Sequence, residues 1–75
     1  MDTVEVNTMV FDDKEFFEVD ILDNGTDRYD FYAEIDNPEN VKIFKLINVN
    51  GEDYLEDVNA NELVEALKLF NIKYN

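Results

Sequence analysis

Apolar and charged side chains alternate along two stretches in the first half of the chain. Residues 15–22 and 28–35 both follow this two-residue period, which is typical of β-strands with one buried face. The segment Asp23-Asn24-Gly25-Thr26 lies between them and is rich in residues that favour turns. The pattern therefore predicts an antiparallel hairpin.

The register of this hairpin follows from the requirement that its two apolar sets share one face. That condition places Ile21 opposite Tyr29, across a loop of three or five residues centred on Gly25. The same register places Asp20 opposite Asp30.

A second hairpin is predicted around Asn50-Gly51, the residue pair preferred in two-residue type I′ turns. Residues 41–49 carry apolar side chains on both faces, which fits either a bulge or a strand covered on both sides. The turn fixes the register, and the expected pairs are Ile47 with Tyr54, Leu46 with Leu55, and Lys45 with Glu56.

The end of the chain has the signals of a helix over residues 60–72. Asn59 is a suitable N-cap, and Glu62 stands three residues later as in a capping box. Leu63, Ala66, Leu67 and Phe70 recur at helical spacing and need a surface to pack on.

These elements predict one α+β domain over residues 1–75. It is expected to be an antiparallel β-meander with the C-terminal helix packed on its inner face. The sheet has four or five strands, depending on whether Thr8–Phe11 pairs across a turn at Asp12-Asp13-Lys14, and residues 1–6 are expected to fray. The predicted core consists of Phe17, Val19, Ile21, Tyr29, Phe31, Ile43, Ile47, Tyr54, Leu63, Leu67 and Phe70.

Five runs follow one another along the chain, at residues 15–19, 28–32, 41–46, 50–56 and 62–67. Their order resembles that of the small acidic YrzB-like proteins, a bacterial family without an established activity. The similarity covers about residues 9–72, and the break at residues 36–40 is shorter than in many members. It implies a cytoplasmic protein and carries over no site residues.

Composition argues against most catalytic chemistry. The chain has no Cys, His, Ser, Gln or Trp, so nucleophilic triads, imidazole catalysis and ordinary zinc sites have no residues to build them. Its two glycines are isolated and form no phosphate loop. The spacing of acids around either glycine does not match an EF-hand, which leaves at most a weak calcium site at Asp12, Asp13 and Glu15. We therefore expect no enzyme, cofactor or bound metal.

Charge is the feature that points to a function. The chain holds 19 acidic and 6 basic residues, for a net charge of −13. Such a field repels nucleic acid and anionic membranes and attracts basic partners. Because no apolar run is long enough to cross a bilayer and no secretory signal is evident, the expected location is the cytoplasm.

The predicted strands place Glu18, Asp20, Asp30 and Glu34 as a row of like charges on one sheet face. Like charges on neighbouring strands destabilise a sheet, which suggests that such a row has a function. We expect a non-enzymatic module that binds a basic protein surface through these four residues. The alternatives are a DNA-mimic inhibitor of a nucleic-acid-binding protein, a small structural or self-associating protein that is a monomer or weak homodimer, and an acidic face that only confers solubility.

Overall fold

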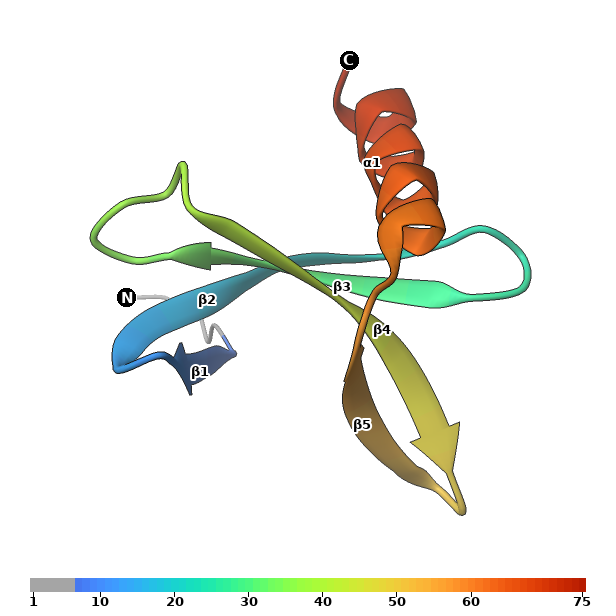
Figure 1. Ribbon diagram of the computed structural model, residues 1–75, viewed down its shortest axis with the longest axis horizontal. Helices are drawn as coiled ribbons and strands as arrows, with labels where there is room; N and C mark the ends of the chain where they lie inside the picture. Colours follow the sequence, from blue (N-terminus) through green and yellow to red (C-terminus); the bar gives the residue numbers. More distant parts are fainter. Residues whose placement is uncertain (1–6) are drawn as a thin grey trace, which may run out of the picture.

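Within residues 7–75 the protein forms five strands and one helix. The computed structural model describes residues 7–75, and the strands form one antiparallel sheet in the order β1-β2-β3-β4-β5. The sheet is a curled half-barrel, and α1 follows β5 and packs back against β2 (Figure 1), which confirms the predicted α+β meander. The elements are β1 (Thr8–Phe11), β2 (Lys14–Asp23), β3 (Arg28–Glu34), β4 (Val41–Val49), β5 (Glu52–Asp57) and α1 (Ala60–Tyr74). The expected fraying concerns residues outside the described part of the chain.

The first strand forms because a two-residue turn returns it onto β2. Phe11 pairs with Lys14, and the residues between them, Asp12 and Asp13, have φ angles of 52° and 63°. Aspartate tolerates this left-handed conformation better than most residues. The sheet therefore has five strands.

The β2–β3 hairpin has a different register from the predicted one near its turn. Leu22, not Ile21, pairs with Tyr29, and Asp20 pairs with Phe31 and not with Asp30. The loop between the paired ends contains four residues. Its shape is held by the Asn24 side chain, whose Oδ1 accepts hydrogen bonds from the backbone N–H groups of Thr26 (2.9 Å) and Asp27 (2.7 Å).

A β-bulge between Glu18 and Asp20 then restores the predicted register farther from the turn. Beyond the bulge, Phe17 pairs with Ala33. A bulge inserts one unpaired residue, here Val19, and so changes which side chains share a face. The prediction was therefore wrong for the half of the hairpin next to the loop.

The second hairpin has the predicted register throughout. Asn50 and Gly51 both have positive φ angles, 53° and 86°, as a type I′ turn requires. Strand β4 pairs without irregularity with both of its neighbours, which excludes a bulge. Of the two explanations for its apolar pattern, a strand covered on both sides remains. The three confirmed pairs are Ile47 with Tyr54, Leu46 with Leu55, and Lys45 with Glu56.

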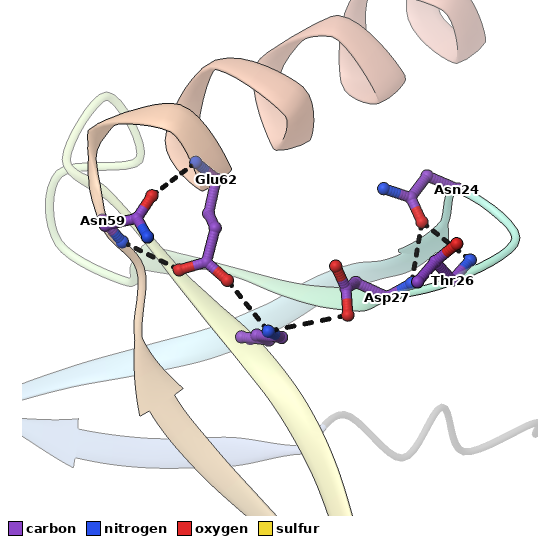
Figure 2. Close-up of polar contacts among 6 residues, drawn as sticks. Asn24, Thr26, Asp27, Asn59 and Glu62 are labelled. Atoms are coloured by element: carbon purple, nitrogen blue, oxygen red, sulfur yellow. Dashed lines mark hydrogen bonds and ion pairs between the residues drawn. The ribbon is translucent and has the colours of Figure 1, made fainter.

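Helix α1 begins at the predicted cap and ends two residues later than expected. The Asn59 side chain accepts from the Glu62 N–H (2.8 Å), and Glu62 accepts from the Asn59 N–H (3.0 Å). Lys45 of β4 reaches the same carboxylate at 2.9 Å and the Asp27 carboxylate at 3.5 Å (Figure 2). One ammonium group thus ties the helix N-terminus to the sheet and to the β2–β3 loop.

Side chains pack on both faces of the sheet. The face that carries α1, here called the helix face, buries Leu22, Tyr29, Phe31 and Ala66, with Ile43, Val58, Leu69 and Phe70 partly buried against them. The opposite face, here called the open face, carries an aromatic cluster. Its members are Phe11, Phe16, Tyr32 and Phe44, with ring centroids 5.0–6.1 Å apart.

The predicted core was right at its centre and wrong at its edges. Tyr29 and Phe31 are almost fully buried, whereas Val19, Tyr54, Leu63 and Leu67 are 38–51% exposed. The pattern could not reveal that α1 covers only part of its face, or that Phe16 and Tyr32 are buried in a second core. The partial cover by α1 and the second core both arise because side chains pack on the two faces of one sheet.

Candidate binding site on the open face of the sheet

A hollow of about 310 Å³ lies on the open face, and residues from all five strands and Asn7 line it. Its apolar walls include Met9 of β1, Leu46 of β4 and Leu55 of β5. The curl of the sheet brings these strands around one space, since β1 and β5 are its two edges. Its polar lining consists of Asn7, Glu18, Asp30, Tyr32 and Asp53.

Asp30 is the most unusual group of this hollow. The residue is only 2% exposed. Its Oδ2 atom accepts a hydrogen bond from the Tyr32 hydroxyl at 3.0 Å, whereas its Oδ1 atom is buried and has no hydrogen-bond donor among residues 7–75. A buried oxygen without a partner destabilises a fold by about 1–3 kcal/mol, and such atoms are rare in native proteins.

Glu18 lies beside Asp30 on the same face. It pairs with Tyr32 across the strands, and its Oε1 atom accepts from the Asn7 side chain at 3.2 Å. Burial raises the pKa of Asp30 to about 7, and the neighbouring Glu18 carboxyl adds to this effect, because two adjacent carboxyl groups share a proton more readily than they both ionise. The Tyr32 hydroxyl and the positive charge of Arg28 act in the opposite direction.

The hollow therefore holds two neighbouring carboxyl groups whose simultaneous ionisation is unfavourable. One proton can be retained between such groups, or a cation can enter and neutralise them. Burial also raises the pKa of Tyr32, so its hydroxyl keeps its proton and remains a donor to Asp30. The arrangement suits the binding of a small positive group.

The structure separates the four predicted site residues. The bulge turns Asp20 to the helix face, where it bonds the Lys73 ammonium (2.5 Å) and the Tyr74 hydroxyl. The Lys73 hydrogen bond, followed by that of Tyr74, lowers the pKa of Asp20. The predicted row of four charges on one face is therefore wrong.

Glu34 lies on the open face but is only 8% exposed and is engaged elsewhere. Its Oε1 atom accepts from the Asn40 side chain at 3.0 Å and lies 4.0 Å from the Lys14 ammonium. Of the four, only Glu18 and Asp30 come together. They are buried or half-buried in a hollow and do not form an exposed ladder.

Sequence reasoning missed the partners that define the site. Tyr32 follows Asp30 by two residues on one strand and so shares its face, a signal present in the sequence. Asn7 and Asp53 reach the hollow only through the curl of the sheet, which no local pattern records.

Two other classes of site can be assessed within residues 7–75. No three acidic side chains gather there as a metal site, and Asp12, Asp13 and Glu15 are therefore not such a group. None of the helices in that range has the length and apolar character needed to span a membrane.

Comparison with protein-family models, curated proteins and solved structures finds no match for this chain.

Proposed function

We propose that the protein is a non-enzymatic acidic module that binds a basic surface of a partner protein, with one lysine or arginine side chain of the partner entering the hollow. The observation that carries the proposal is Asp30, whose Oδ1 atom is buried beside Glu18 without a donor among the described residues. An ammonium or guanidinium group supplies both the missing donors and the missing positive charge.

The shape of the hollow supports this occupant. Lysine and arginine carry their charge on an apolar stem, and Met9, Leu46 and Leu55 line the same hollow as the carboxyl groups. The net charge of −13 adds long-range attraction, which accelerates encounters with a basic partner more than it tightens the complex.

The other expectations from the sequence have less support. A phosphate mimic needs exposed rows of negative charge, but Asp30 and Glu34 are buried. Membership of the YrzB-like family, with its cytoplasmic location, remains part of the proposal and adds no activity to it.

The test compares the wild type with two variants that remove the same charge. Glu18→Gln with Asp30→Asn alters the hollow, whereas Asp13→Asn with Glu56→Gln alters two exposed residues that neither line the hollow nor take part in an ion pair within residues 7–75. Each protein is immobilised and incubated with a lysate of the source organism at low salt and at about 0.5 M NaCl, which screens exposed charges. Captured proteins are identified by mass spectrometry and their affinities are measured after purification.

We expect one basic protein to bind the wild type and the control variant with Asp13→Asn and Glu56→Gln, and to be lost with the hollow variant. High salt should weaken this binding. A partner that binds the hollow variant as tightly as the wild type would refute the assignment of the hollow. Binding that falls equally in both variants would show that only net charge matters.

A further inference from the structure

A second surface, on the helix face, carries an apolar groove of about 410 Å³. Its lining includes Phe17 and Val19 of β2, Ala33 of β3, Val41 of β4 and Leu67 of α1, with Pro38 also contributing. Val19, Val41 and Leu67 are 39%, 48% and 50% exposed. An apolar surface of this kind is typical of a binding groove.

Helix α1 forms one side of the groove and is anchored to the sheet near both of its ends. Near its start, Glu62 bonds to Lys45 at 2.9 Å, and near its end Lys73 bonds to Asp20 at 2.5 Å. The only buried residue of the helix is Ala66. These two ion pairs hold α1 in its position beside the groove.

We infer that this groove docks an amphipathic helix of a partner protein, with an apolar face toward the sheet and basic residues along its flanks. A helix is indicated because the groove lies over the face of β2, β3 and β4, and the backbone N–H and C=O groups of a strand point along the sheet, not out of its face. A bound segment must therefore satisfy its own backbone hydrogen bonds. It would lie beside α1 at the usual distance of about 8–10 Å between packed helices.

Charge complementarity selects basic flanks. Glu15, Asp36 and Glu39, which are exposed, neighbour the groove residues Phe17 and Pro38 in sequence. Each of the five lysines in residues 7–75 already lies within 4.0 Å of a carboxylate. Glu15, Asp36 and Glu39 are in none of these ion pairs, so among the described residues no lysine neutralises them. A second copy would bring its own charge of −13 to the same place, which disfavours self-association.

The test uses a synthetic peptide of about 16 residues with leucines on one helical face and lysines on the other. A peptide of the same composition, with the order scrambled so that no apolar face forms, is the control ligand. Fluorescence anisotropy in about 0.15 M NaCl measures both affinities, and backbone NMR shifts locate the site.

Four single variants and the hollow variant complete the design. Val19→Asn and Leu67→Gln change the groove, whereas Val10→Asn and Ile72→Gln change apolar residues that are 67% and 78% exposed and lie outside it. Circular dichroism checks that each variant is folded. The variant with Glu18→Gln and Asp30→Asn separates this site from the hollow.

We expect the amphipathic peptide to bind at least tenfold more tightly than the scrambled one. The groove variants should lose at least tenfold in affinity, and the other variants, including the hollow variant, less than twofold. Shifts should centre on Phe17, Ala33 and Leu67. Equal binding of the two peptides, unchanged binding by the groove variants, or shifts confined to Glu18 and Asp30 would overturn the inference. So would a wild-type dimer in sedimentation equilibrium that Leu67→Gln dissociates, because the occupant would then be a second copy.

Discussion

Asp30 is a carboxyl group held in the protein interior against its preference for water. Its pKa of about 7 means that, near neutral pH, the fold resists ionising a group that is fully ionised in the unfolded chain. Natural proteins retain such groups most often at functional sites. At the residue scale, the ionised form of Asp30 that the proposed binding requires is therefore the form that destabilises the fold.

Replacement of Asp30 by asparagine is expected to stabilise the protein at pH 8 by about 1–3 kcal/mol. Asparagine can still accept from Tyr32 and has no charge to desolvate. Because the pKa of Asp30 is raised in the folded state, its stabilising contribution is complete below about pH 4 and is lost as the pH rises through about 7. Thermal unfolding from pH 4 to 8 should therefore show the advantage of the variant growing with pH.

The matched control is Asp36→Asn, which removes one charge from an exposed residue. It should shift the unfolding midpoint only slightly at any pH in this range. If the two variants respond alike at pH 8, Asp30 is not destabilised by burial, and the main support for the hollow disappears.

At the element scale, the sequence predicts correctly those features that a few adjacent residues determine. Asn50-Gly51 fixes the register of its hairpin by itself, and the Asn59 and Glu62 cap fixes the start of α1. Alternation was a weaker guide for β2, because one extra residue at Val19 moved Asp20 to the other face. The bulge is a property of the paired strands and has no counterpart in the pattern of one strand.

The sequence could predict the candidate site only in part. Glu18 and Asp30 could be singled out because acids recur on predicted strands. Their burial could not be predicted, because it depends on the aromatic cluster and on the curl that brings β1 and β5 around the hollow.

Replacement of Asn59 by alanine is expected to lower the free energy of unfolding by about 1 kcal/mol. The change removes the acceptor of the Glu62 N–H and loosens a turn that Lys45 holds to the sheet. For a chain of this size, the unfolding midpoint should fall by about 4–8 °C, which circular dichroism can measure. Asn61→Ala changes an exposed residue of the same turn and should not lower the midpoint. Equal losses in both variants would show that the cap contributes little.

At the scale of the whole molecule, two electrostatic effects oppose each other. The net charge of −13 repels itself in the compact state, while ion pairs such as Lys45 with Glu62 and Lys73 with Asp20 hold α1 to the sheet. Salt screens both effects. The response of stability to salt therefore reports which one is larger.

We expect NaCl to stabilise the protein, with the unfolding midpoint rising between about 0.02 and 0.5 M, because exposed ion pairs contribute little while the excess charge acts over the whole surface. The variant with Asp36→Asn and Glu39→Gln carries two fewer negative charges without touching an ion pair that holds α1. It should start from a higher midpoint at low salt and gain less from added salt. A midpoint that falls with NaCl in both proteins would mean that the anchors of α1 outweigh the repulsion. In that case, the acidic surface would be nearly free of a stability penalty and would need no functional explanation.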